Sequence, residues 1–274
     1  MEDWTGVLRL GAEERNGKTV AKNVYFQGAF KVMRPIYHDE SGQACYYLLN
    51  PGGGYLDGDR YQMKVVLEKQ AKLTLTTQSA TKIYKTPRSL AYQEVEFHLK
   101  DGSYLEYIPD PLIGYQDARY KQKTVIHMEK GCTLLYSDII TPGWSANGEK
   151  FSYDTLQLIN EIYMENELVA FDHIKLNPAY QDMKGLGYME GYSHLGSMIV
   201  IHENMNAEFL DRLYQEIPKQ SKEWKIGVSL LPIPGFTLRV LANTTQNIER
   251  IITEIHQLLS QEWFNKKPSF LRKY

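Results

Sequence analysis

Cysteine is scarce in this sequence, which holds only Cys45 and Cys132 among 274 residues. Two cysteines argue against a disulfide scaffold and favour a reducing compartment. The N-terminal stretch is polar and acidic, unlike a secretory signal. No apolar run approaches the roughly 20 residues that a membrane-spanning helix needs. We therefore expect a cytoplasmic protein with no membrane partner.

An excess of one charge is also lacking. The 31 basic and 33 acidic residues leave a formal net charge of -2, whereas a nucleic-acid binder usually carries a basic stripe. The densest basic cluster is a short one near the C-terminus, at Lys266, Lys267, Arg272 and Lys273. We predict no nucleic-acid partner. Because no linker rich in Pro, Gly or Ser interrupts the chain, we expect one domain over residues 1–274.

The sequence lacks the motifs of tight metal sites and of common enzymes. It contains no Cys-x-x-Cys and no His-Glu-x-x-His, and no two of its seven histidines stand at helical ligand spacing. The Gly-x-Ser-x-Gly elbow of serine hydrolases is absent too. We expect neither catalysis nor a tightly bound cofactor.

What is present favours β-structure. Tyrosine is abundant, with 20 residues, and aromatic and β-branched side chains suit pleated surfaces. Within Tyr92–Leu99, Val95, Phe97 and Leu99 alternate with polar residues, as a strand with one buried face requires. The other predicted strands are Met63–Glu68, Lys72–Thr77, Ser103–Ile108 and Thr124–Met128.

A weak internal repeat suggests how these strands are arranged. VVLEKQAKLTL, FHLKDGSYLEY and IHMEKGCTLLY each place a charged turn between two strand-like segments. They recur at intervals of roughly 30 residues, which favours a wound or stacked, β-helix-like sheet over a plain sandwich. The turns at Asp101-Gly102 and Lys130-Gly131 predict tight hairpins, in which glycine supplies a positive φ.

Two segments instead show helical periodicity. Asn206–Pro218 places Phe209, Leu210 and Leu213 along one side. Thr245–Trp263 carries apolar residues at i, i+3 and i+4 spacing, with Thr244 or Thr245 as its cap. We expect this C-terminal helix to pack against a sheet.

The sharpest local feature is the segment NPGGGYLDGD at Asn50–Asp59. A phosphate-binding loop would continue with Gly-Lys-Ser/Thr and a helix, but here Asp57 and Asp59 precede a strand. A calcium loop would need glycine at Gln62, although Glu68 stands at its twelfth position. Two readings remain, a tight turn with solvated aspartates and a functional loop.

A second segment, LTLTTQSATKIY at Leu73–Tyr84, begins as a strand and becomes a run of small polar residues able to line a wet cleft. Together the two segments resemble the signature of the UreD (UreH) family of urease accessory proteins. Val32–Tyr37, Leu105–Arg119 and Thr141–Phe151 resemble further family elements. The residues that match the paired motif, and for which a structural role is expected, are Pro51, Gly52, Gly53, Gly58, Ala80, Thr81 and Tyr84.

The chain departs from the family pattern at two places. Trp144 stands where many members carry arginine, and the C-terminal PSFLRKY lacks the family's Pro-Arg-x-Trp ending. Any role tied to those family residues is therefore not carried over to this chain.

The resemblance implies a mainly β, wound sheet with a few α-helices and a non-catalytic role in urease maturation. Such a protein acts with UreF and the GTPase UreG, docks on apo-urease, and passes nickel through an internal tunnel. A tunnel needs scattered oxygen ligands that each release the ion readily. The residues we expect to line it are Asp57, Asp59, Thr77, Ser79, Lys82, Asp110, Asp117 and Glu149. Lys82 has a second reading, as the partner of an aspartate.

Two other functions compete with this one. A carbohydrate-active enzyme on a wound β scaffold could use Asp57 and Asp59 as its two carboxylates. Such enzymes often line their clefts with tryptophan, but the four tryptophans here are dispersed along the chain. A protein-interaction module without metal handling would have the same fold and the same partners. It would differ only in that it does not handle nickel.

Overall fold

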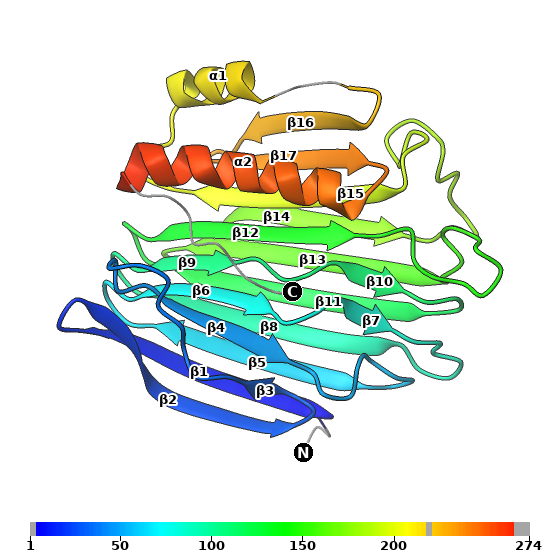
Figure 1. Cartoon of the computed structure of the whole chain (residues 1–274), viewed down its shortest axis with the longest axis horizontal. Coiled ribbons are helices and arrows are strands. Elements are labelled where there is room, and N and C mark those ends of the chain that lie inside the picture. Colours follow the sequence, from blue (N-terminus) through cyan, green and yellow to red (C-terminus); the bar gives the residue numbers. More distant parts are fainter. Residues whose placement is uncertain (1–3, 218–220, 266–274) are drawn as a thin grey trace.

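Two large β-sheets face each other in the computed structural model, which describes residues 4–217 and 221–265 (Figure 1). The predicted mainly β fold with a few helices is confirmed. The first sheet runs in the order β14 (Glu167–Leu176), β13 (Thr155–Met164), β11 (Arg119–Met128), β8 (Ala91–Leu99), β5 (Arg60–Leu67), β1 (Gly6–Arg15) and β2 (Lys18–Gly28).

The second sheet is longer and carries two short strands beside its main path. Its order is β16 (Trp224–Leu230), β17 (Gly235–Ala242), β15 (His194–Ile201), β12 (Thr133–Ile140), β9 (Tyr104–Tyr107), β6 (Lys72–Thr77), β4 (Ala44–Leu49) and β3 (Lys31–Val32). Beside this path, β7 (Thr81–Ile83) pairs with β10 (Leu112–Gly114), which also pairs with β12.

The chain winds between the two sheets. From β4 to β13 it passes repeatedly from the second sheet to the first and back, and each strand pairs in parallel with its counterpart in the next turn. The antiparallel strands β2 and β14 end the first sheet on either side. The expected wound, stacked arrangement is therefore confirmed.

The internal repeat maps onto these windings in register. Phe97 pairs with Val65 on one side and Ile126 on the other, and Leu105 lies between Leu73 and Leu134. All six side chains are buried in the core between the sheets. The repeat exists because each winding contributes the same apolar layer to one continuous core.

The prediction of hairpins at the repeat turns is wrong. Asp101-Gly102 joins β8 of the first sheet to β9 of the second, and Lys130-Gly131 joins β11 to β12 in the same way. The glycines do have positive φ, 67° and 77°, and Gln70 in the preceding winding has φ 62°. A corner between sheets thus needs the same backbone conformation as a hairpin. The local sequence therefore does not distinguish a corner from a hairpin.

Both predicted helices are present. α1 (Ala207–Glu216) is capped by Asn206, and Pro218, the predicted end, lies outside the described residues. α2 (Thr245–Phe264) is capped by Thr244, whose side chain accepts a hydrogen bond from the Asn247 amide. α2 lies across the outer face of the second sheet (Figure 1) and forms a second apolar core with β12, β15 and β17.

One buried ion pair ties α2 to the windings. His256 Nε2 lies 2.9 Å from Glu106 Oε1, and both side chains are almost inaccessible. Burial alone would raise the pKa of Glu106, but His256 and the hydroxyls of Thr74 and Tyr104 outweigh it and lower that pKa to about 2. The folded-state pKa lies below the ordinary value, so the pair stabilises the fold above about pH 4.5 and is lost as the pH falls towards 2.

We predict that His256→Gln lowers the free energy of unfolding by about 1–2 kcal/mol at pH 7, because the buried Glu106 carboxylate loses its contact with the His256 ring. Urea denaturation should measure this loss, and it should shrink as the pH falls towards 2. Glu254→Gln is the matched control on the same helix. Its pair with Arg250 is exposed and should contribute much less to stability. Equal losses for both variants would contradict a special role of the buried pair.

Candidate functional site

A cavity lined by both polar and apolar side chains leads from the surface into the space between the two sheets. Its volume is about 60 Å³, which is room for a few water molecules. Four of the predicted tunnel residues line it, namely Thr77, Ser79, Lys82 and Asp110. Ser79 is exposed and Asp138 is buried, so the lining runs from solvent to the interior.

The glycine-rich segment forms one wall of the cavity mouth. The Tyr55 amide donates a 2.7 Å hydrogen bond to the Lys82 carbonyl, and Tyr55 bridges to Ile83 of β7. A Cβ on Gly54 would lie 2.6 Å from that carbonyl oxygen, and the φ of Gly54 is +158°. Glycine is therefore required at position 54 so that the loop can lie against β7.

Thr77 and Asp110 hold the next part of the wall. The Thr77 hydroxyl donates to Asp110 Oδ2 at 3.0 Å and accepts from the Asp110 amide at 2.7 Å. The pair joins the end of β6 to the loop after β9. Thr81 adds a further link, because its amide donates to the Pro111 carbonyl.

Inside the cavity, polar side chains form a connected hydrogen-bond network. Tyr55 and Tyr120 both donate to Gln93 Oε1, at 2.9 and 2.7 Å. Tyr120 also lies 3.0 Å from Gln122 Oε1, and the Gln122 amide reaches the Tyr136 hydroxyl at 3.3 Å. Gln93 and Gln122 line the cavity, so amide and hydroxyl groups continue from the mouth towards the interior.

Asp138 lies at the inner end of this network. Tyr136 donates a 2.6 Å hydrogen bond to its carboxylate. Burial raises the pKa of Asp138 to about 6, since desolvation outweighs the hydrogen bond from Tyr136. A buried carboxyl group that ionises near neutral pH and lines a cavity is a candidate functional group with a physical basis.

The sequence prediction missed Asp138, although the signal was present. In the run LLYSDII, strand alternation places Asp138 on the same face as Leu134, Tyr136 and Ile140. A carboxylate on the apolar face of a buried strand needs an explanation. Gln93 is a second such case, because it shares the buried face of β8 with Val95, Phe97 and Leu99.

The two aspartates of the glycine-rich turn lie outside the cavity lining. Asp57 accepts hydrogen bonds from the amides of Ser89 and Arg88 and from the Arg88 side chain, which lower its pKa to about 2. Asp59 accepts from the Thr5 hydroxyl and the Leu56 amide, at 3.1 and 2.8 Å. Both carboxylates thus hold the turn in place.

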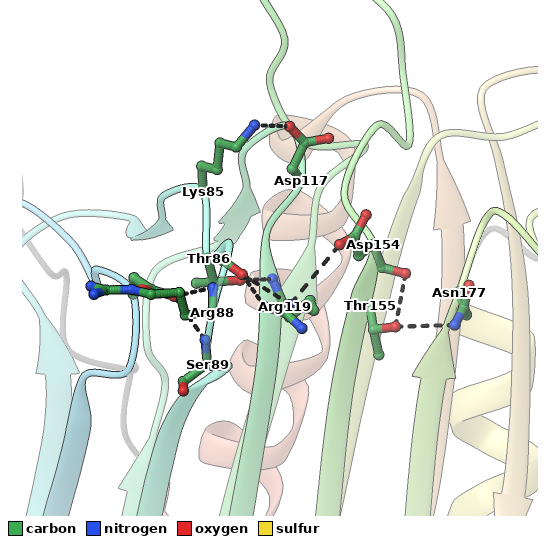
Figure 2. Close-up of polar contacts among 10 residues, drawn as sticks. Lys85, Thr86, Arg88, Ser89, Asp117, Arg119, Asp154, Thr155 and Asn177 are labelled. Atoms are coloured by element: carbon green, nitrogen blue, oxygen red, sulfur yellow. Dashed lines mark hydrogen bonds and ion pairs between the residues drawn. The ribbon is translucent and has the colours of Figure 1, made fainter.

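Asp117 and Glu149, the other predicted tunnel residues, are also outside the lining. Asp117 forms an ion pair with Lys85, whose Nζ lies 2.7 Å from Asp117 Oδ2. Figure 2 shows this pair within a polar network of the loops. Arg119 lies between Thr86 and Asp154 in the same view. Glu149 lies on an exposed loop, where its amide donates to Asn147.

The remaining motif residues have structural contacts. Gly53 and Gly58 both have φ of +78°, a conformation that favours glycine. The Tyr84 amide donates to the Tyr55 carbonyl, which fastens β7 to the glycine-rich turn. Pro51 and Gly52 are exposed, and Ala80 lines the cavity mouth.

The oxygen atoms that line the cavity are ligands suited to weak binding of a hard or borderline cation. Carboxylate, hydroxyl, amide and carbonyl oxygens line the cavity, and none of its lining residues in the described part of the chain is cysteine or histidine. Oxygen ligands hold first-row divalent ions more weakly than thiolates or imidazoles do.

The fold and cavity define a wound β scaffold that encloses a small cavity lined in part by oxygen-bearing side chains. Residues 5–273 match the family described as UreD urease accessory protein, and the chain belongs to this family. It is 49% identical over 274 residues to a urease accessory protein UreD of Lachnoclostridium phytofermentans, covering all of both chains. It is 44% identical to the UreD of Staphylococcus aureus strain bovine RF122, over the whole chain and 99% of that protein.

Within residues 4–217 and 221–265, neither helix is long and apolar enough to span a bilayer. The basic cluster at Lys266–Lys273 and the C-terminal PSFLRKY lie outside the described residues.

Proposed function

We propose that this protein is the scaffold through which nickel is inserted into apo-urease. It acts in the cytoplasm with UreF and the GTPase UreG, and the nickel ion, its cargo, passes through the cavity between the sheets. The protein needs no resident cofactor, because its task is to guide an ion rather than to transform a substrate. GTP hydrolysis belongs to the partner.

The observation that carries this proposal is the oxygen-lined cavity with a buried carboxylate at its inner end. Thr77, Ser79 and Asp110 offer oxygen ligands near the mouth, and Asp138 offers one inside. An entering cation would stabilise the ionised form of Asp138, which burial otherwise disfavours. The family's role in urease maturation supports the same function.

The structure does not favour the carbohydrate-active alternative. Such an enzyme needs one carboxyl group as acid and another as nucleophile or base, both facing the sugar. Asp57 is engaged by two backbone amides and Arg88, and Asp59 by Thr5 and Leu56. The second alternative, a scaffold that binds partners but carries no metal, differs from our proposal only in the use of the cavity.

Blocking the cavity mouth separates these two functions. The variant Ala80→Phe would be expressed with a urease operon from which the native gene is deleted. We predict that the accessory complex still assembles but that urease takes up several-fold less nickel. The added ring would fill the mouth beside Ser79 and Lys82. Urease activity, urease nickel content and co-purification of the accessory proteins should be measured together, with wild type restoring all three.

The matched control is Ala146→Phe, which adds the same ring to an exposed loop and should behave as wild type. Full nickel loading by Ala80→Phe would favour the scaffold without metal handling. Failure of the wild-type gene to restore urease would contradict the proposed role itself.

A further inference from the structure

Three side chains of types that can ligate a metal ion meet on the outer face of the first sheet, away from the cavity. Glu96 and His98 lie two residues apart on β8, and His127 lies directly beside His98 on β11. Their neighbours Phe97 and Ile126 point into the core between the sheets, so these three side chains point outward. We call Glu96, His98 and His127 the outer cluster.

The geometry of the outer cluster is close to that of a chelate. One ligand atom from each residue lies within 4.8 Å of the other two. The two imidazole rings are stacked, with centroids 4.9 Å apart and 17° between their planes. Donor atoms around a tetrahedral ion with bonds of about 2.1 Å are about 3.4 Å apart. Small side-chain rotations would therefore bring the three donors onto one ion.

The backbone holds these donors rigidly. Strands β5, β8 and β11 pair in register along their whole lengths, with no bulge between β8 and β11. Tyr163 of β13 stacks on the His127 ring, with centroids 5.3 Å apart. All three side chains are partly buried, which limits their rotamers before any ion arrives.

Burial and neighbouring groups shift the pKa values of two residues in the outer cluster. Burial and the neighbouring His98 lower the pKa of His127. Burial alone would raise the pKa of Glu96, but His98 and Lys64 outweigh it and lower that pKa.

One cation already competes for the carboxylate. Lys64 Nζ lies 3.2 Å from Glu96 Oε1, the same oxygen that contacts His98 Nε2 at 2.5 Å. Since 44% of the Lys64 side chain is exposed, it can turn into solvent when another cation takes its place. Lys64 therefore weakens the binding of another cation but does not block the site.

We propose that the outer cluster binds one divalent first-row transition-metal ion through two imidazoles and one carboxylate. Imidazole and carboxylate together suit nickel and zinc better than magnesium or calcium. Three protein ligands leave positions for water or for a ligand from a partner. Such a site holds an ion outside the cavity and does not depend on nickel passing between the sheets.

The test is equilibrium dialysis of the full-length chain against Ni²⁺ and, separately, Zn²⁺. We expect His98→Gln/His127→Gln to lose the tightest site and bind at least about 100-fold more weakly, because even outer-shell partners of metal ligands contribute 10- to 100-fold. His173→Gln is the matched control, because His173 is an exposed histidine of the same sheet that bonds Gln157. It should bind as wild type does.

For Lys64→Met we predict the opposite effect, which is tighter metal binding. Removing the competing ammonium while keeping the apolar stem should tighten binding by about tenfold, since it frees Glu96 from an ion pair. Metal should also raise the melting temperature of Lys64→Met more than that of wild type. Wild-type affinity in the double histidine variant, or unchanged affinity in Lys64→Met, would overturn the proposal.

The same measurements distinguish metal binding at the outer cluster from metal binding in the cavity. Asp138→Asn should retain outer-cluster binding, because Asp138 lies between the sheets. Loss of the tight site in Asp138→Asn with retention in the double histidine variant would place metal binding in the cavity instead.

Discussion

Asp138→Asn should leave the protein folded and more stable while urease stays poor in nickel. Under the proposed passage, the buried carboxylate is the ligand that draws the cation from the cavity mouth to the interior. An amide of the same size keeps an oxygen but loses the negative charge. We expect the rate of urease activation to fall at least about tenfold, which corresponds to about 1.4 kcal/mol on the barrier to passage.

The stability gain follows from the raised pKa. Asp138 has a pKa of about 6 in the folded protein and 3.8 as its ordinary value, so the folded state binds the proton more tightly. Between these values, stability falls as the pH rises, because ionisation then costs more in the folded protein. A shift of about two units corresponds to about 3 kcal/mol at pH 8. Asparagine does not ionise, so the variant should avoid this loss.

Urea denaturation of wild type and Asp138→Asn at pH 4 and pH 8 measures the gain, which should be present at pH 8 and absent at pH 4. Asp57→Asn is the control, because the lowered pKa of Asp57 gives the opposite sign. The contribution of Asp57 is present above its ordinary pKa and fades as the pH falls towards 2. Normal nickel loading by Asp138→Asn would exclude Asp138 from the passage.

The fold was predictable from the sequence because its signals are local and repeated. The in-register layers of Phe97 and Leu105 appear in the sequence as a pattern that recurs about every 30 residues. The spacing of Ile248, Ile251 and Ile255 predicts α2 for the same reason. The hairpin prediction failed because Gly102 has a positive φ in either arrangement, while the partner of β9 is decided by strands far away in sequence.

The candidate site was predictable only in part, since the sequence shows motifs but not which side of a strand is enclosed. Thr77 and Asp110 line the cavity, whereas Asp57 lies outside its lining and accepts hydrogen bonds within its turn. A role of these residues in nickel passage stays a prediction. Asp138 and Gln93 were missed because polar residues in a strand usually mark its exposed face. Strand alternation places them on the apolar face, but only the facing sheet in the folded structure shows that they border a cavity.

Gly54→Ala should be strongly destabilising and should damage the cavity mouth. The new Cβ would lie 2.6 Å from the Lys82 carbonyl oxygen and 2.7 Å from the Tyr84 ring, at a φ of +158°. Neither contact can relax without moving the glycine-rich turn away from β7. We expect a loss of about 3 kcal/mol in the free energy of unfolding, combining backbone strain with the clash. Thermal and urea denaturation measure this loss.

Gly53→Ala is the control that separates the clash from the backbone conformation. Its φ is also positive, +78°, but the nearest atom to its new Cβ is the Tyr84 hydroxyl oxygen at 4.0 Å. Only the left-handed conformation then costs free energy, about 1–2 kcal/mol. Because the turn keeps its place, Gly53→Ala should still load nickel, whereas Gly54→Ala should not. Equal stability losses would mean that the turn does not rest on β7, and the cavity mouth would then have no fixed wall on this side.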